Sequence, residues 1–257
     1  RGTSIGIMAL ARLAILPELV PSLKWIQATS AGIGQFVKRN RYAERMPGVV
    51  FTTASGVHAV PLAEHVIQVL LVHYKNFVLA QNQQQRHHWE RYSASDLVGR
   101  AIGIIGLGRI GSTVAKYAKA LGMRTLGADL SVKEGIVDHW YPMSQLNEML
   151  PQCEVLVVIV PHTPDTEKLI NKELLLRLPN GAYFVNIARG AVVNEPELID
   201  VLRSGHLSGA ALDVAAQEPL PPDSPLWDMQ GVIVTPHSAS TSDRENQRLT
   251  DLFCDNI

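Results

Sequence analysis

The amino-acid sequence predicts a two-domain α/β protein whose larger domain is a doubly wound parallel sheet. Between residues 101 and 234, apolar runs of strand length alternate with segments of helical periodicity. That alternation is typical of parallel strands covered by helices on both faces. The chain has 257 residues, which suits two modest domains better than one large core.

The larger domain is expected from residue 76 to residue 240. Strands are predicted at 101–106, 124–128, 155–160, 182–187, 208–214 and 231–234, and helices at 110–121, 172–178 and 195–203. Gly122 and Gly205 stand one and two residues after helical segments, where glycine commonly ends a helix.

The smaller domain is expected to be discontinuous, with residues 1–75 in front and residues 241–257 returning to it. It has strand candidates at 23–28 and 49–52. A long helix is predicted from Pro61 to Phe77, followed by the polar run 81–88, and the domain boundary is expected near its end. The apolar segment 5–16 is interrupted by Arg12, so it is interpreted as part of a domain truncated at both ends rather than as a signal peptide.

Composition excludes several classes of function. The formal net charge is -1, and no basic stretch is present to hold a nucleic acid or a membrane surface. Cys153 and Cys254 are far apart and lie in no metal-ligand spacing, and the histidines form no metal pattern either. We therefore expect two reduced thiols in a cytoplasmic protein, with no metal.

A glycine-rich turn, Gly106-Leu-Gly-Arg-Ile-Gly111, follows the first strand of the larger domain and opens a helix. Gly106 permits a tight turn, Gly108 lets the backbone approach a pyrophosphate, and Gly111 lets helix and strand pack closely. Asp129 ends the next strand, eighteen residues after Gly111 (129 − 111). A carboxylate there accepts from ribose hydroxyls and repels a 2′-phosphate, which favours NAD over NADP. The alternative is a structural turn with a solvated aspartate.

Three polar side chains follow later strands, at the edge where open α/β sheets carry their sites. Arg189 can bind a carboxylate through its fork of donors, and His237 can deliver a proton to a carbonyl oxygen. Glu218 can hold the imidazole in one tautomer. Together they supply what the reduction of a 2-oxo acid needs. Taken singly, each residue could instead be structural. Arg189 could form an ion pair, Glu218 could be a solvated acid on a loop, and His237 could lie at the edge of the core with its hydrogen bonds made to the backbone.

The sequence resembles the D-isomer-specific 2-hydroxyacid dehydrogenase family. Four stretches carry the resemblance, in order and spacing: Gly103–Gly111, Asn186-Ile-Ala-Arg-Gly190, Ala211-Leu-Asp-Val214 with Gln217-Glu-Pro219, and Thr235-Pro-His237. The resemblance implies that Arg189 binds the substrate carboxylate, that His237 is the general acid for reduction and base for oxidation, and that Glu218 orients it. It also implies a flavodoxin-like smaller domain, a substrate cleft between the domains and a homodimer built largely on the cofactor domain.

Further site residues are implied by the same resemblance. The cofactor-binding set is Gly106, Gly108, Arg109, Ile110, Gly111, Asp129, Val160, Pro161, Thr166, Ile187, Ala188 and Asp213, with Asp213 near the nicotinamide carboxamide. The substrate-binding set is Ser30, Ala31 and Gly32 together with Arg189 and His237. Two other readings share these motifs: a dinucleotide-sensing corepressor of the C-terminal-binding-protein type and a dehydrogenase of phosphite.

Overall fold

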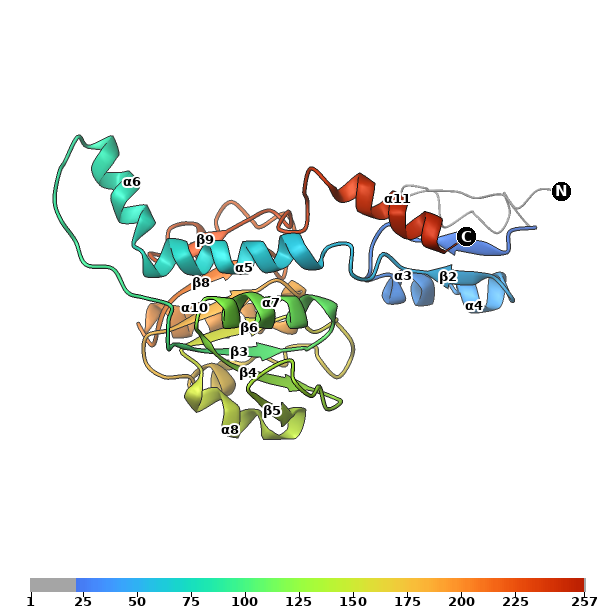
Figure 1. Cartoon of the computed structure of the whole chain (residues 1–257), viewed down its shortest axis with the longest axis horizontal. Coiled ribbons are helices and arrows are strands. Elements are labelled where there is room, and N and C mark those ends of the chain that lie inside the picture. Colours follow the sequence, from blue (N-terminus) through green and yellow to red (C-terminus); the bar gives the residue numbers. More distant parts are fainter. Residues whose placement is uncertain (1–21, 257) are drawn as a thin grey trace. The chain divides into compact units, whose positions relative to one another are not determined.

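The computed structural model describes residues 22–256 (Figure 1). By compactness the chain divides into two units, one running to His58 and resuming at Ser242, the other spanning Ala59–Thr241. The sequence predicted the boundary between residues 75 and 76, at the end of the long helix, whereas the two compact units divide at its start. The assignment of these parts as substrate and cofactor domains stays a prediction. The apolar segment 5–16 lies outside the described residues.

A seven-stranded sheet forms the centre of the larger unit, in the order β5-β4-β3-β6-β7-β8-β9. All of its neighbouring strands are parallel. The strands are β3 (Ala101–Ile105), β4 (Arg124–Asp129), β5 (His139–Pro142), β6 (Val155–Val158), β7 (Ala182–Asn186), β8 (Leu207–Leu212) and β9 (Val232–Val234). The edge strand β5 was not predicted, because its sequence His-Trp-Tyr-Pro lacks an apolar run.

Helices cover both faces of this sheet (Figure 1). One apolar core joins the sheet to α5 (Ala59–Tyr74) and α7 (Arg109–Ala120). The other joins it to α8 (Leu146–Met149), α9 (Lys172–Leu175) and α10 (Glu195–Arg203). Short 3-10 turns at Met143–Gln145, Leu150–Gln152, Gly190–Val192 and Pro225–Trp227 complete the connections. The doubly wound Rossmann-type fold predicted from the sequence is therefore confirmed.

The long helix predicted from Pro61 to Phe77 ends earlier than expected, and a second helix follows it. α5 ends at Tyr74, Asn76 adopts a left-handed φ of 51°, and α6 runs from Phe77 to Gln85. α6 has no buried residue and leads away from the sheet (Figure 1). The sequence pattern misplaced this element because Phe77 continues the apolar spacing of α5 although the chain changes direction at Asn76.

The smaller unit contains a parallel pair of strands, β1 (Trp25–Gln27) and β2 (Val50–Thr52). Its helices are α3 (Gly34–Arg39), α4 (Tyr42–Arg45) and the returning α11 (Glu245–Asp255). Trp25 stacks on Phe253, with ring centroids 5.4 Å apart, and this contact ties α11 to the strand pair. Within residues 22–256, no helix is long and apolar enough to cross a membrane.

Candidate active site

The three predicted catalytic residues follow three strands that are neighbours in the sheet. Arg189 comes after β7, Glu218 after β8 and His237 after β9. Because parallel strands point the same way, their carboxyl ends meet at one edge of the sheet. The order β7-β8-β9 therefore gathers side chains that are up to 48 residues apart in sequence (237 − 189).

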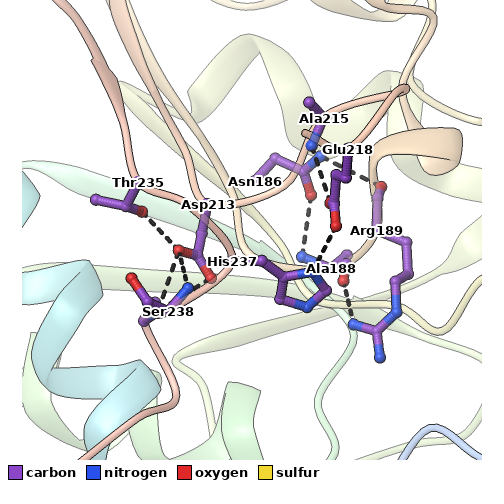
Figure 2. Close-up of polar contacts among 10 residues, drawn as sticks. Asn186, Ala188, Arg189, Asp213, Ala215, Glu218, Thr235, His237 and Ser238 are labelled. Carbon is purple, nitrogen blue, oxygen red and sulfur yellow. Dashed lines mark hydrogen bonds and ion pairs between the residues drawn. The ribbon is translucent and has the colours of Figure 1, made fainter. Parts of the chain in front are cut away.

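His237 and Glu218 are in direct contact. The Nδ1 atom of the His237 imidazole lies 2.8 Å from Oε2 of Glu218 (Figure 2). The other carboxylate oxygen, Oε1, accepts from the backbone N–H of Ala215 at 3.2 Å, which anchors Glu218 to its own loop. Both side chains remain about two-fifths exposed, at 43% and 40%. Glu218 thus binds one ring nitrogen of His237, and the rest of the imidazole stays accessible to solvent at the edge of the sheet.

Arg189 lies on the adjoining turn, with its side chain exposed. One guanidinium nitrogen, Nη1, donates to the Ala188 carbonyl at 2.6 Å (Figure 2). Among residues 22–256 it forms no ion pair, so the reading of Arg189 as a structural ion-pair residue finds no partner there. Its donors face solvent on the same edge of the sheet as the imidazole, where they can bind an anion.

Glycine at position 190 brings the Arg189 turn against the Glu218 loop. A Cβ atom added to Gly190 would overlap the carbonyl group of Ala215, so any side chain here would force the two loops apart. Glu195 also binds this loop, because its Oε2 accepts from the Ala216 N–H at 2.8 Å. Sequence reasoning missed Gly190, Ala215 and Glu195 as parts of the site, because the contacts of Gly190 with Ala215 and of Glu195 with Ala216 join segments more than twenty residues apart.

A cavity of about 410 Å³ adjoins the His237–Glu218 pair. Its walls are mainly apolar and come from the ends of β8 and β9 and the following loops. They include Leu212, Pro219, Leu220, Leu226 and Trp227. Apolar walls lower the local dielectric, which strengthens an interaction between a carboxylate and a protonated imidazole.

The glycine-rich turn has the geometry that its sequence predicted. Gly106 has a φ of 100°, and a Cβ at Gly111 would overlap the Gly106 carbonyl, so α7 can pack this closely only with glycine there. Around Gly108, by contrast, no atom lies within 4 Å of a Cβ position. The space beside the first amides of α7 is therefore open, and these residues fit the pyrophosphate of a dinucleotide.

Asp129 ends β4 beside this turn and makes a contact that was not predicted. Its Oδ2 accepts from the backbone N–H of Leu107 at 2.6 Å, and Oδ1 accepts from the Ser131 N–H at 3.3 Å. The side chain is half-buried. Asp129 therefore braces the glycine-rich turn in addition to standing where a ribose diol is expected.

The other predicted cofactor residues lie on loops or at the start of α7, at the same edge of the sheet. Val160 packs against the Gly106 turn, and the Thr166 hydroxyl donates to the Pro161 carbonyl at 2.7 Å, which closes the loop after β6. Ile187 and Ala188 are buried directly after β7. Arg109 and Ile110 open α7.

Asp213 is buried at the end of β8, and its negative charge acts on His65 of α5. Burial lowers the pKa of His65 below its ordinary value of 6.5, and the charge of Asp213 partly opposes this. Ser30, Ala31 and Gly32 lie in the smaller unit and are exposed, three to five residues after the end of β1. Their part in substrate binding stays a prediction. Among the described residues, no group of three or more His, Cys, Asp or Glu is arranged to hold a metal.

Comparison with known proteins identifies the family. A family model described as the NAD-binding domain of D-isomer-specific 2-hydroxyacid dehydrogenases matches residues 67–239, more than half of the chain. The chain belongs to the D-isomer-specific 2-hydroxyacid dehydrogenase family. The resemblance seen in the sequence motifs is thus confirmed. As a member of this family, the chain is an oxidoreductase that moves a hydride between a nicotinamide dinucleotide and a 2-hydroxy or 2-oxo acid, acting on CH–OH donors.

Three similar proteins illustrate this 2-hydroxyacid dehydrogenase relationship. A glycerate dehydrogenase of Methylorubrum extorquens is 33% identical over 93% of this chain and 76% of its own length. The crystal structure of a D-isomer-specific 2-hydroxyacid dehydrogenase family protein from Aeromonas salmonicida matches 98% of this chain and 80% of its own, with 32% identity and a TM-score of 0.87. An NADPH-dependent glyoxylate/hydroxypyruvate reductase from Sinorhizobium meliloti, in complex with NADP and sulfate, matches 98% and 81%, with 26% identity and a TM-score of 0.82.

Proposed function

We propose that this dehydrogenase interconverts a small 2-oxo acid and its D-2-hydroxy acid, with Arg189, His237 and Glu218 as the residues that carry the chemistry. The observation that carries the proposal is the 2.8 Å contact between His237 Nδ1 and Glu218 Oε2 beside the exposed guanidinium of Arg189. This arrangement supplies an anion site and an oriented acid or base on one edge of the sheet.

The residues divide the work as follows. The fork of Arg189 binds the substrate carboxylate and polarises the neighbouring carbonyl. With Nδ1 held by Glu218, Nε2 of His237 is the atom that passes a proton to the carbonyl oxygen in reduction and takes it back in oxidation. The carboxylate stabilises the protonated ring. A bound nicotinamide dinucleotide supplies or accepts the hydride.

Turnover tests this assignment. We expect NADH oxidation with one or more of glyoxylate, hydroxypyruvate, pyruvate and bulkier 2-oxo acids, with the D-2-hydroxy acid as the product. A panel that also holds phosphite separates an organic-acid dehydrogenase from a phosphite dehydrogenase. Binding of NADH without turnover of any panel member would instead favour a dinucleotide-sensing protein.

We propose NAD(H) as the preferred cofactor, on the strength of Asp129. Its carboxylate ends β4 at the place where a ribose diol is expected, and it is followed by Leu130 and Ser131 rather than by an arginine. The Sinorhizobium meliloti relative is described as NADPH-dependent, so the preference within this family varies. A negative charge beside the adenosine ribose disfavours a 2′-phosphate.

Asp129→Asn tests the cofactor preference without loosening the turn. The asparagine oxygen can still accept from the Leu107 N–H, whereas Asp129→Ala loses this bond as well. We expect Asp129→Asn to narrow the ratio of kcat/KM for NADH over NADPH by roughly tenfold or more, because a charge-assisted hydrogen bond is worth about 1.5–3 kcal/mol. Steady-state kinetics with both cofactors measures this. A wild-type protein that uses NADPH better than NADH contradicts the proposal.

We also propose a homodimer formed by the larger unit. A groove of about 830 Å³ between α5, α7 and the start of α6 is lined mainly by apolar residues, among them Leu71, Phe77, Tyr117 and Leu121. Phe77 is 51% exposed, and Trp89, beyond α6, is 97% exposed. α6 itself carries no charged residue. The start of α6 exposes the apolar side chains of Phe77, Val78 and Leu79 beside an apolar groove, and this combination suits a second copy of the chain, since each subunit can cover the other's apolar surface.

Phe77→Glu tests this interface. A charge in the groove must be desolvated when the groove is covered, so we expect the variant to run as a monomer where the wild type is a dimer. Leu176→Glu is the matched control and should remain dimeric, because Leu176 is a large apolar residue about as exposed as Phe77 but lies outside the groove. Analytical ultracentrifugation of the three proteins measures the masses. A monomeric wild type, or a dimeric Phe77→Glu protein, contradicts the proposed interface.

We propose a cytoplasmic location for the enzyme. Cys153 is buried and forms no disulfide with Cys254. Burial raises the pKa of the Cys153 thiol to about 12, which keeps it protonated. Reduced, unreactive thiols are usual in a reducing compartment.

A further inference from the structure

Two buried polar side chains stand at the ends of β7 and β8, directly beneath the proposed catalytic residues. Asn186 is 1% exposed and Asp213 is 3% exposed. A buried carboxylate or amide is tolerated when its hydrogen bonds are satisfied, so the partners of these groups indicate their purpose.

Asp213 is bonded almost entirely to the turn that carries His237. Its Oδ1 accepts from the Thr235 hydroxyl at 2.6 Å and from the Ser238 N–H at 3.0 Å (Figure 2). The same oxygen also accepts from the Ala239 N–H at 3.1 Å. Its backbone carbonyl accepts from the His237 N–H at 2.8 Å. One residue thus holds both sides of the turn around His237.

The backbone of His237 explains why such a hold is needed. His237 has a φ of 53°, in the left-handed region that side-chain-bearing residues rarely occupy. A conformation of this kind persists only where surrounding bonds over-determine it. It also turns the imidazole toward Glu218. Release of the turn would let His237 relax and would separate Nδ1 from the carboxylate.

Asn186 has the same relation to the turn that carries Arg189. Its Oδ1 accepts from the Ala188 N–H at 3.0 Å, and its Nδ2 donates to the Arg189 carbonyl at 3.3 Å (Figure 2). The two buried residues are themselves joined, because the Asp213 N–H donates to the Asn186 carbonyl at 3.1 Å.

We propose that Asp213 and Asn186 form a two-part clamp of positioning residues, in which Asp213 sets His237 against Glu218 and Asn186 sets the backbone of Arg189. This inference rests on the proposed roles of Arg189 and His237. It assigns Asp213 a function inside the protein, separate from the nicotinamide contact that family resemblance implies. It also predicts that loss of each residue affects a different step. Loss of Asp213 should impair proton transfer, and loss of Asn186 should impair binding of the oxo acid.

The test combines kinetics with hydrogen–deuterium exchange of the segment 235–240. For Asp213→Ala we expect faster exchange in this segment and a fall in kcat for reduction on the order of a hundredfold, the scale for a misplaced reacting group. kcat is measured at saturating NADH, and NADH affinity is followed separately by fluorescence, because family resemblance also places Asp213 near the nicotinamide. For Asn186→Ala we expect mainly a rise in KM for the oxo acid, by roughly tenfold, since Arg189 binds the substrate carboxylate.

Milder variants keep the test valid if Asp213→Ala does not fold. Asp213→Asn retains an acceptor oxygen and should recover much of the kcat that Asp213→Ala loses. Thr235→Val removes the hydroxyl that donates to Asp213 and should lower kcat. Asp138→Ala is the matched control. The Asp138 carboxylate likewise accepts from a backbone N–H and a threonine hydroxyl, both of Thr125, but near the start of β4. It should lower Tm without changing kcat or exchange at 235–240.

The outcomes separate the clamp from the proposed function. Unchanged exchange at 235–240 in both Asp213→Ala and Thr235→Val overturns the clamp, whatever happens to activity. Faster exchange with an unchanged kcat overturns it too. Weakened NADH binding with unchanged exchange assigns Asp213 to the cofactor alone. A wild type without turnover contradicts the proposed function, and the exchange data then still report on the clamp.

Discussion

Replacement of His237 by alanine is expected to lower kcat/KM for oxo-acid reduction by on the order of a hundredfold or more, the usual scale for a lost general acid. A hundredfold loss corresponds to about 2.7 kcal/mol of transition-state stabilisation. No other imidazole replaces it in the bond to Glu218 among the described residues. NADH binding should change little, because the imidazole acts on the substrate carbonyl.

The pH dependence identifies the role of the pair more sharply than the rate alone. Reduction needs a proton on His237 and oxidation needs it absent, so reduction should fall and oxidation should rise as pH increases. Glu218→Gln keeps the shape but removes a negative charge 2.8 Å from Nδ1. Because that charge stabilises the protonated ring, Glu218→Gln should lower kcat for reduction, and His237→Ala should abolish the fall of reduction with pH.

The exposed His139 on β5 provides the control for these variants. His139→Ala should leave both the rate and the pH profile as in the wild type. Profiles of kcat/KM against pH for the three variants decide the assignment. A near-normal kcat in Glu218→Gln would remove Glu218 from the site, and a near-normal rate in His237→Ala would remove His237.

Arg189→Lys is expected to lose much of kcat/KM for the oxo acid, by roughly a hundredfold. Lysine keeps the positive charge but lacks the planar fork that binds a carboxylate at two points. Loss of orientation in the bound substrate should lower kcat as well as raise KM, because the carbonyl is then no longer aligned with the proton donor. The Kd of NADH should change far less.

The same substitution at a surface arginine is the control for Arg189→Lys. Arg177 pairs with Glu173 at 3.1 Å, one helical turn away, and Arg177→Lys preserves that exposed ion pair. Its kinetics should equal those of the wild type. If Arg189→Lys also retains a near-normal kcat/KM, Arg189 does not bind the substrate carboxylate.

Much of the fold could be predicted because it depends on local pattern. The strands β3 and β6 are apolar throughout, β7 is apolar up to Asn186, and the amphipathic α7 and α10 end near glycine. The glycine-rich turn and Asp129 were predictable for the same reason, since spacing along one strand-turn-helix segment defines them. The separate helix α6 was not, because an apolar pattern does not report that the chain changes direction at Asn76.

The catalytic residues could be predicted in part from the sequence. The sequence shows that Arg189, Glu218 and His237 each follow a strand, and parallel strands place such residues at one edge. The order β7-β8-β9 and the 2.8 Å contact between Glu218 and His237 come only from the folded chain.

The sequence by itself determined the residue types, the strand and helix segments and the turn that suits a dinucleotide. The tertiary structure alone decided three supports of the site: the fit of Gly190 against the Ala215 loop, the bond of Glu195 to the Ala216 amide, and the bonds of Asp213 to the His237 turn. The Asp213 bonds join atoms 22 to 26 residues apart, and they depend on the register that sets Leu212 of β8 beside Val234 of β9. Such register follows from the packing of the whole sheet, so no local pattern in the chain encodes it.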